Sequence, residues 1–319
     1  MPEIRFPNSK LRILTYDRAP SDFDPLTASQ KQLLRHGYPS RPDPKRQPEL
    51  LKRFQHFLSR KVTHITPTFQ RIEGKTHKPA IKPAGTRRGE SKTAGTATAS
   101  NWSGSVVFPP PGGSFMCVTG EWTVPNPYVL SEDGWYYASE WIGIDGFGSA
   151  NVLQAGTDTD AYWLFAQRAV YAWWEWYPEP EVQITNFPVS PGDMMVCLIS
   201  LDSLRAPRRA NIYLMNESNR VATSFKVVAP SGVWLVGNCA EWIVERPEVN
   251  GHITWLSDYD TAYFDNGVAG YVIGSTDSIV PLGSGTFVTM VGPDGKPLSV
   301  PIKETDELMK VLWKGTGRV

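Results

Sequence analysis

The distribution of apolar and polar residues changes near residue 100, and the two parts of the chain predict different structures. Residues 1–100 are mostly polar, with a capping-box sequence at 27–30 that predicts a first helix. A second helix is predicted near residue 50, where Phe54 and Leu58 share one apolar stripe. Residues 75–100 are rich in Lys, Arg, Gly, Thr, Ala and Pro, which is typical of a mobile linker. We therefore expect a partly helical leader and linker over residues 1–100.

Residues 101–319 show short runs of strand character, interrupted about every ten residues by Gly, Pro, Asn or Asp. Helical periodicity is nearly absent, and only residues 305–312 are predicted to form a short helix. Many evenly spaced strands without alternating helices predict an all-β, antiparallel sandwich or barrel over residues 101–319. The predicted strands include residues 105–108, 115–124, 136–144, 171–177, 194–201, 211–214, 233–236 and 268–273.

One predicted strand, in the sequence GNCAEWIVER at residues 237–246, carries a candidate catalytic carboxylate. Strand alternation places Glu241, Ile243 and Glu245 on one face and Trp242 on the other. Because Trp and Ile flank Glu241, burial of its charged form is costly, and its pKa is expected to be raised. A carboxyl group with a raised pKa is a candidate general acid or base. The alternative is an edge strand with Glu241 in water.

Three further stretches place polar and aromatic side chains on single strand faces. The faces are Val152, Gln154, Gly156 and Asp158; Tyr171, Trp173, Glu175 and Tyr177; and Trp141, Gly143 and Asp145. Each stretch is also consistent with a surface strand that carries aromatic cross-strand pairs.

Charge divides the chain at the same point as the hydrophobic pattern. Residues 1–100 contain 20 Lys and Arg against 8 Asp and Glu, whereas residues 101–319 contain 12 against 24. The net charges of +12 and −12 indicate that the two parts attract each other. Nucleic-acid binding by the basic part is the alternative that we considered and do not favour.

Several enzyme classes are disfavoured by the residues that are present. His252 is the single histidine after residue 100, and no GxSxG, HExxH or phosphate-binding loop sequence occurs. The three cysteines lack metal-site spacing, and they fit either one disulfide with a free thiol or three thiols. No apolar run is long enough to span a membrane, and the first residues show no secretory signal segment. Carboxylate and amide chemistry without a metal or cofactor remains.

An ordered set of motifs resembles the glutamic peptidases known as eqolisins, family G1. The motifs are NWSG (101–104), TGEWTVP (119–125), WIGIDG (141–146), LQAGTD (153–158), WEWYP (174–178) and AEWIVE (240–245). The resemblance implies a sandwich of two antiparallel seven-stranded sheets, an acid-active endopeptidase that needs no cofactor, and a catalytic dyad of Gln154 and Glu241. It also implies a substrate cleft lined by Trp141, Asp145, Asp158 and Glu175.

The chemistry of peptide hydrolysis suits these residue types. Glu241 as a carboxylate can take a proton from water and return it to the leaving amine, while the Gln154 amide donates to the oxyanion. An ordinary glutamate stays ionised down to about pH 4, so activity in acid is expected. Asp158 and Glu175 are expected to be protonated in this range and to donate hydrogen bonds.

The partners expected from this interpretation are polypeptide substrates and the chain's own basic leader, which would act as an intramolecular inhibitor. We expect a monomer that acts outside the cell, as the family resemblance implies, with no nucleic-acid or membrane partner. Two alternatives remain open: a glycoside hydrolase with Glu175 and Glu241 as its paired carboxylates, and a non-catalytic carbohydrate- or protein-binding sandwich.

Overall fold

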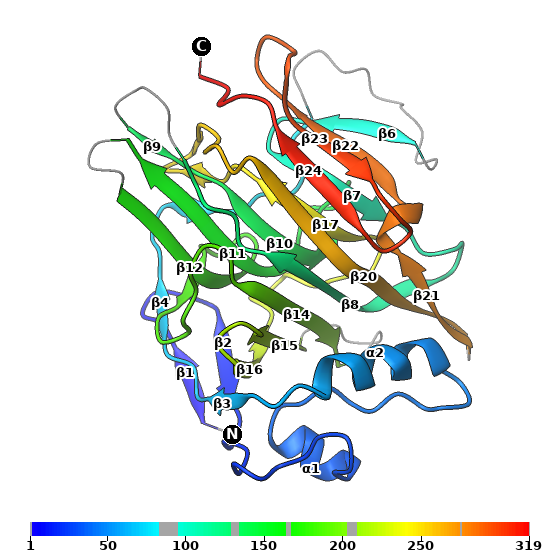
Figure 1. Ribbon diagram of the computed structural model, residues 1–319. Helices are drawn as coiled ribbons and strands as arrows, with labels where there is room; N and C mark the ends of the chain where they lie inside the picture. The colour runs from blue at the N-terminus through cyan, green and yellow to red at the C-terminus, as the bar shows by residue number, and fades with distance from the viewer. Residues whose placement is uncertain are drawn as a thin grey trace.

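The chain forms two stacked layers of mainly antiparallel strands, shown in Figure 1. The computed structural model describes residues 2–82, 95–128, 134–163, 167–202, 209–274 and 276–318. Pairing is continuous through 21 of its strands because strands at the rim link the two layers. The predicted all-β sandwich is confirmed.

The first sheet positions most of the candidate residues. Its seven strands, in spatial order, are β13 (Val182–Ile184), β12 (Gln167–Trp176), β11 (Leu153–Tyr162), β10 (Ser139–Ile144), β17 (Ala240–Glu245), β7 (Trp102–Val107) and β22 (Thr286–Val291). Because β17 lies between β10 and β7, its predicted alternative as an edge strand is wrong.

The second sheet packs against the first across a shared core. Its seven strands are β16 (Val221–Val228), β15 (Arg209–Asn216), β14 (Met194–Leu201), β8 (Ser114–Thr123), β20 (Thr261–Ile273), β24 (Met309–Trp313) and β23 (Pro297–Lys303). The pair β22–β23 joins the two sheets at one rim. Shorter elements complete the body: β9 (Trp135–Tyr136), β18 (Glu248–Val249), β19 (His252–Ile253), β21 (Thr276–Pro281) and a 3-10 turn (Leu282–Ser284).

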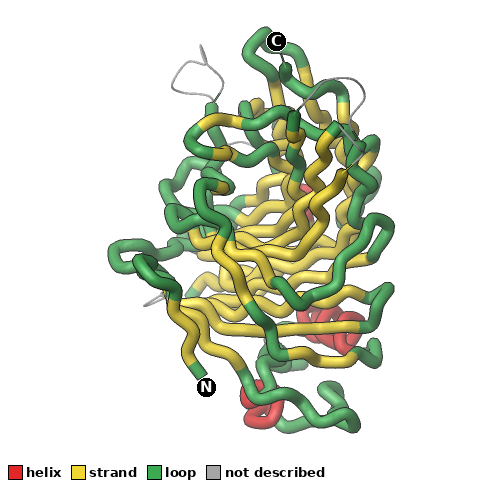
Figure 2. The backbone as a smooth tube through the Cα atoms, turned by 90° about the vertical axis from the view of Figure 1, so that its left-hand side faces the viewer, coloured by secondary structure: helices red, strands yellow, loops and turns green. Residues whose placement is uncertain are grey.

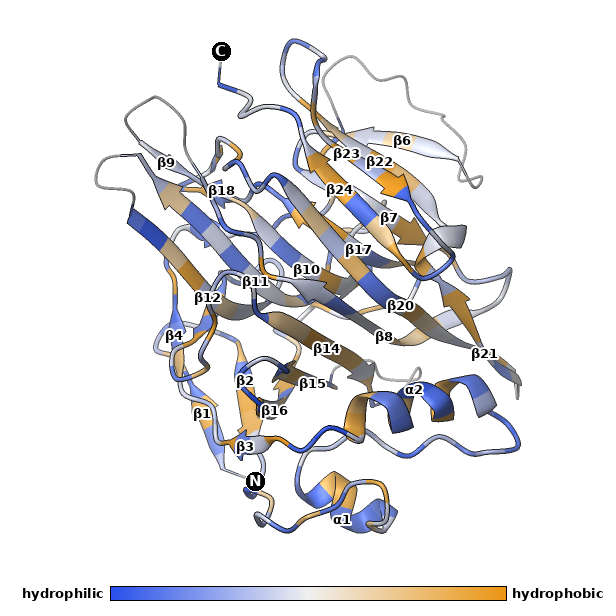
Figure 3. Cartoon of the chain, in the orientation of Figure 1, coloured by the Kyte–Doolittle hydropathy of each residue, from blue (hydrophilic) through white to orange (hydrophobic). Residues whose placement is uncertain are grey.

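Alternating side chains along the strands build the core between the sheets, and Figure 3 shows this alternation as changes of colour along single strands. Trp242 on β17 points inward, where its indole Nε1 donates to the carbonyl oxygen of Thr119 on β8 at 3.0 Å. Trp122 on β8 donates to Thr157 Oγ1 of β11 at 2.9 Å. These buried indoles are therefore hydrogen-bonded across the two layers, and the opposite face of β17 and β11 points outward.

The leader contributes strands as well as helices. Its elements are β1 (Glu3–Arg5), β2 (Arg12–Thr15), α1 (Gln30–Arg35), α2 (Pro48–Leu58), β3 (Thr63–Ile65), β4 (Phe69–Arg71), β5 (Lys75–Thr76) and β6 (Thr96–Ala99). Strands β2 and β3 pair with β16, and β4 pairs with β13, so the leader covers one edge of each sheet. The sequence predicts only the helices, because a strand of three or four residues carries too little periodicity to detect.

The two helices pack on the outer face of the second sheet, at the lower end of the molecule in Figure 2. Helix α1 begins with a capping box at Ser29 and Gln32, close to the predicted position. Helix α2 buries Phe54, Phe57 and Leu58 against the sheet. Among the described residues, no helix is long and apolar enough to cross a membrane.

Two sequence predictions about local structure are wrong. Residues 233–236 form an irregular segment, because a side-chain carboxylate of Asp145 accepts the N–H groups of Val236 and Asn238 in place of a strand partner. Residues 305–308 form a turn, in which Thr305 Oγ1 accepts the N–H groups of Glu307 and Leu308, and residues 309–312 belong to β24, which pairs with β20.

The cysteines are three unpaired thiols. Cys197 and Cys239 are buried and Cys117 is partly buried. The sequence left open one disulfide with a free thiol or three thiols, and the structure has three thiols.

We predict that Phe57→Ala loosens the leader without unfolding the body. Removal of this buried ring costs about 3 kcal/mol, which raises the population of undocked helix about a hundredfold. Trypsin should then cut the leader near α2 correspondingly faster, while the thermal midpoint of the body changes little. Leu34→Ala on α1, a residue 47% exposed, is the control and should leave the rate unchanged. Equal cleavage rates for the two variants would contradict this account of leader packing.

Candidate active site

Gln154 and Glu241 lie on one face of the first sheet with a glycine between them. Gly143 on β10 is directly opposite Gln154 of β11 on one side and Glu241 of β17 on the other. Directly opposed residues share a face, and two strand spacings place the flanking Cα atoms about 10 Å apart. Both side chains therefore extend from one row of the sheet.

Gly143 leaves room for these two side chains to approach each other. A Cβ atom at this position would lie 2.9 Å from Glu241 Oε1 and 2.9 Å from the Trp141 ring. The Glu241 carboxyl group therefore extends over Gly143, toward the strand that carries Gln154. Position 143 has no side chain because Glu241 and Trp141 leave no room for one. The backbone conformation of this residue does not itself require glycine.

Glu241 is fully buried, and few contacts replace the water that its carboxyl group has lost. Neither oxygen has a hydrogen-bond partner of normal geometry among the described residues. Burial, and then the charge of Asp145, raise the pKa of Glu241 well above its ordinary value, with the thiol of Cys239 as a weak opposing influence. The predicted raised pKa is confirmed.

Asp145 supports the segment that leads into β17. Its carboxylate accepts from Val236 N at 2.6 Å and from Asn238 N at 2.8 Å, and the residue has a positive φ of 69°. Burial raises the pKa of Asp145, although these backbone donors oppose the shift. The contacts of Asp145 are therefore with the chain that positions Glu241.

Aromatic rings form the floor next to the row of Gln154 and Glu241. Trp141 is fully buried, packs edge-on against Trp102, and donates from Nε1 to Glu245 Oε2 at 3.0 Å. Trp173 lies on the same outer face, in a second hydrophobic cluster separate from the core between the sheets. This apolar floor gives the neighbouring acids a weakly polar surrounding.

Five buried acids lie on this outer face, and we call them the acidic cluster. Its members are Asp158, Asp160, Glu175, Glu181 and Glu245. Asp158 and Glu175 were predicted from the sequence, whereas the other three were not assigned a role. If the period of two is continued along each strand past Asp158 and Glu241, it places Asp160 and Glu245 on the same faces as these residues. No comparable pattern marks Glu181, which precedes the short strand β13.

The leader crosses the acidic cluster through residues 75–82, which we call the leader segment. Lys75 is buried, and its Nζ pairs with Asp158, with Asp160 at 2.7 Å and with Glu181 at 3.6 Å. This segment was predicted to be part of a mobile linker over residues 75–100, and that prediction is wrong for residues 75–82 and for β6, which pairs with β22. The flanking dibasic pair Arg87-Arg88 lies outside the described residues.

His77 is the second leader side chain in the cluster, and it is fully buried. Its ring stacks on Trp173 with centroids 3.8 Å apart. Its nitrogens lie 3.0 Å from Glu181 Oε2 and 3.4 Å from Glu245 Oε2. The leader's charge therefore meets the body's charge at one buried place, as the opposite net charges predict.

The backbone of His77 contacts the candidate catalytic row directly. Its N–H donates to Glu175 Oε2 at 2.9 Å, and its carbonyl oxygen accepts from Gln154 Nε2 at 2.7 Å. The other polar atom of the amide, Gln154 Oε1, is buried without a partner among the described residues. A peptide carbonyl thus lies against the amide nitrogen of Gln154.

Charges in the acidic cluster are unequal because the leader neutralises only some of them. Burial raises the pKa of Asp160, Glu175 and Glu181 well above ordinary values, and it raises the pKa of Glu245. Burial also acts on Asp158, but Lys75 and His77 outweigh it and hold its pKa below the ordinary 3.8. With the leader docked, the prediction of a protonated Asp158 in mild acid is therefore wrong, whereas Glu175 is neutral.

One group of residues in the cluster has the spacing of a metal site. His77, Asp158 and Glu181 bring three ligand atoms within 4.8 Å of one another. However, Lys75 Nζ pairs with the same two carboxylates. The Lys75 ammonium group thus supplies the positive charge that a metal would bring.

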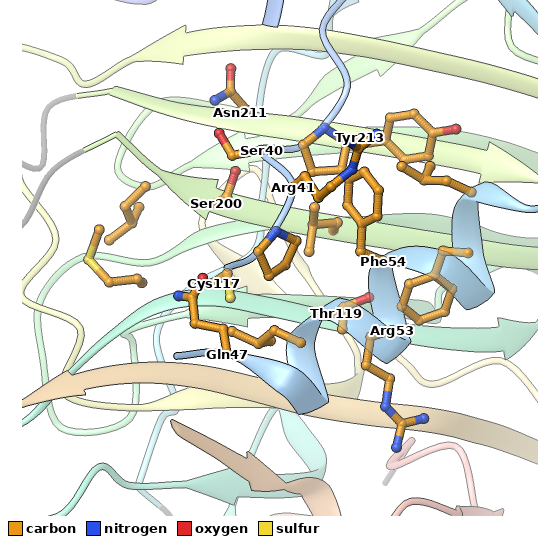
Figure 4. Close-up of a pocket in the computed structure, with 18 of the residues that line it drawn as sticks. Ser40, Arg41, Gln47, Arg53, Phe54, Cys117, Thr119, Ser200, Asn211 and Tyr213 are labelled. Atoms are coloured by element: carbon orange, nitrogen blue, oxygen red, sulfur yellow. The ribbon is translucent and has the colours of Figure 1, made fainter. Parts of the chain in front are cut away.

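A separate cavity of about 480 Å³ lies on the other side of the molecule, between α2 and the second sheet (Figure 4). Its wall includes Phe54 from the leader and Cys117 from β8. Arg41, which points into this region, donates to three leader carbonyls. The cavity is therefore a space within the leader–body contact, distant from the candidate catalytic row.

The chain was compared with known families and structures. Residues 100–306 match the family model described as the Peptidase A4 family. Aspergillopepsin-2 from Aspergillus niger is 28% identical over 234 residues, which cover 66% of this chain and 80% of that protein. Scytalido-glutamic peptidase, solved with a transition state analog inhibitor, has a TM-score of 0.56 at 20% identity, covering 67% of this chain and 98% of that one.

SCP-B, described as a member of the Eqolisin family of Peptidases in a complex with the tripeptide Ala-Ile-His, has a TM-score of 0.51 at 18% identity. The match covers 67% of this chain and 98% of that structure. The structural likenesses show a shared fold, and the family model covers well over half of the chain. The chain therefore belongs to the Peptidase A4 family, and the predicted acid-active glutamic endopeptidase of the eqolisin type is confirmed at the level of the family.

Proposed function

We propose that this endopeptidase hydrolyses peptide bonds with Gln154 and Glu241 as its dyad, and that the docked leader keeps it latent. The observation that carries the proposal is the contact between Gln154 Nε2 and a peptide carbonyl, that of His77, at 2.7 Å. Three buried oxygens without partners, two from Glu241 and one from Gln154, supply acceptors for an attacking water. An amide donor that contacts a peptide carbonyl thus lies in the same row of the sheet as a carboxylate base.

Glu241 acts first as the general base. Its carboxylate takes a proton from the water that attacks the carbonyl carbon, and the Gln154 amide donates to the oxyanion that forms. Glu241 then gives its proton to the amine nitrogen as the C–N bond breaks. This cycle returns both side chains to their starting states.

Substrate binding is assigned to the residues that contact the leader segment. Glu175 accepts a backbone N–H, Asp158 pairs with a basic side chain, and Trp141 forms the floor beside them. Asp145 is better assigned to positioning, because its carboxylate holds the segment before β17. The complex of SCP-B with a tripeptide supports the binding of peptides by this family.

Latency has two physical causes. The leader segment occupies the place of a substrate, and it excludes water from the site. Burial keeps the pKa of Glu241 raised, and a neutral carboxyl group cannot accept a proton from water. Departure of the leader restores water, lowers the pKa of Glu241 toward its ordinary value and so permits base catalysis in acid. Action outside the cell, expected from the family resemblance, is part of this proposal.

The two alternative functions have less support. Glu175 and Glu241 lie in the same row, three strands apart, with Gln154 between them. The amide of Gln154 therefore stands between the two carboxyl groups, where a glycoside hydrolase would need the sugar bond, so this pair suits that chemistry poorly. A non-catalytic binding sandwich does not need an amide and a carboxyl group facing one carbonyl.

We predict that Glu241→Gln abolishes hydrolysis of an unfolded protein at about pH 3, lowering kcat/KM about 10²- to 10⁴-fold. The substitution is nearly isosteric, so the thermal midpoint should be retained. Glu140→Gln is the matched control, because Glu140 is equally buried but faces the core, where burial already raises its pKa. Full activity in Glu241→Gln, or equal loss in both variants, would contradict the assigned base.

We also predict that acid removes the part of leader binding that depends on Lys75. Docking lowers the pKa of Asp158 below 3.8, so its pairing with Lys75 stabilises the docked state above that pH and is lost as the pH falls through the lowered pKa. A peptide of residues 70–82 should therefore inhibit the matured enzyme more strongly than its Lys75→Met variant near pH 5, and this ratio should fall about fivefold near pH 3. The comparison between the two peptides separates this effect from the buried acids whose pKa docking raises, because both peptides cover those acids. An equal ratio at both pH values would rule out this electrostatic explanation.

A further inference from the structure

We propose that Cys239 is a positioning residue for hydrolysis, and that its thiol donates a hydrogen bond to Glu241 when this carboxyl group is ionised. The inference rests on the proposed dyad and deepens it, because it names a third residue that acts through Glu241. It follows from where the thiol lies next to the proposed base.

Cys239 and Glu241 lie on the same face of one chain segment. Cys239 comes directly before β17 and two residues before Glu241, so strand alternation gives both side chains the outer face. The side chain of Cys239 packs in the outer hydrophobic cluster with Trp141, and both Cys239 and Glu241 are fully buried. The thiol is therefore next to the carboxyl group, in a place that water does not reach in the docked form.

Asp145 fixes the backbone at Cys239. The N–H of Asp145 donates to the carbonyl oxygen of Cys239 at 3.0 Å, and its carboxylate accepts from Asn238 N at 2.8 Å. Burial raises the pKa of Asp145, and the N–H of Cys239 is among the backbone donors that oppose this shift. These anchors on both sides of residue 239 fix the direction of its side chain toward the outer face.

The thiol proton has a free choice of direction, and Glu241 lacks a donor. The other contact of Cys239 Sγ is to the carbonyl oxygen of Phe147 at 4.0 Å, which is long even for sulfur. Neither oxygen of Glu241 has a partner of normal geometry among the described residues, so an ionised Glu241 is a strong acceptor without a donor. The S–H group rotates about the Cβ–Sγ bond, and it can therefore turn toward the charged oxygen.

The two side chains shift each other's pKa in opposite directions. Burial, and then the charge of Asp145, raise the pKa of Glu241, and the hydrogen bond from Cys239 is the influence that lowers it. Burial, and then the charges of Glu241 and Asp145, raise the pKa of Cys239, so the thiol keeps its proton throughout the acid range. Cys239 is thus a permanent donor, and it favours the ionised Glu241 that accepts a proton from water.

The strands beside β17 do not duplicate this role. On β7, the residue directly opposite Glu241 is Val106, whose side chain cannot donate. On the other side the row continues across Gly143 to Gln154, and then to Glu175, whose pKa burial raises. Within its own segment, the thiol is therefore the donor that stands next to the carboxyl group.

The test is the pH profile of kcat/KM for an unfolded protein substrate, because its fall at low pH reports the ionisation of Glu241 in the free enzyme. All chains are full length and are activated in acid in the same way. Cys239→Val has about the size of the thiol and no donor, so the fall should move up by about half to one pH unit. Below the fall, kcat/KM should drop about three- to tenfold, while the plateau at higher pH changes less than about twofold. Cys239→Ser keeps a donor and should keep the wild-type profile.

Cys197→Val is the matched control, because Cys197 is equally buried but packs in the core between the sheets. Any loss of thermal stability in this variant should leave the pH profile where it is. If Cys239→Val keeps the wild-type profile, or if Cys239→Ser or Cys197→Val shifts it as much as Cys239→Val does, packing rather than a donor is responsible. The inference is then overturned, while the proposed function stands.

Failure of the proposed function gives a different result. If the folded wild-type chain hydrolyses no unfolded protein at any pH, or if Glu241→Gln hydrolyses it as fast as the wild type does, Glu241 is not the base. The proposed function then fails, and the role of Cys239 fails with it.

Discussion

Burial of carboxyl groups on an outward-facing sheet surface is the constraint on which the rest of the site depends. Six acids, Glu241 and the acidic cluster, lie on a floor of tryptophans under the leader segment. An unpaired buried charge is costly, so such a surface is stable only if its acids are protonated, solvated or paired. The leader pairs three of them with Lys75, places His77 beside Glu181 and Glu245, and leaves Glu175 neutral. Fold, latency and chemistry therefore share one electrostatic origin.

The same surface becomes useful once it is solvated. Acids that burial keeps neutral can bind peptide backbone or basic side chains when water returns, and Glu241 can then ionise. The glycine between Gln154 and Glu241 keeps a space over the sheet that a larger side chain would fill. On the proposed function, the body folds in a latent form without a separate inhibitor, because the first residues of the chain occupy the site.

Much of this arrangement could be predicted from the sequence. The period of two placed Gln154 with Asp158 on one strand face and gave Glu175 and Glu241 their own strand faces, and the ordered motifs led to the family. Residues 75–82 could not be predicted, because a short basic stretch carries no periodicity and its order comes from distant acids. The same holds for residues 233–236, where a side chain of Asp145 replaces a strand partner. In both segments the structure depends on contacts between residues far apart in the chain, and a single sequence does not show which distant residues will meet.

The most direct measurement of the central claim is amide hydrogen exchange near pH 7 of the full-length Glu241→Gln chain, with and without the Lys75→Met substitution. The account predicts that the amide of His77, which donates to Glu175, and those of its neighbours in the leader segment are protected in the Glu241→Gln chain. They should exchange much faster once Lys75 is replaced, because its buried pairs with Asp158 and Asp160 are lost. The strands of the body should remain protected in both chains. Protection of the leader segment that is absent, or unchanged by Lys75→Met, would contradict a leader held in the site by charge.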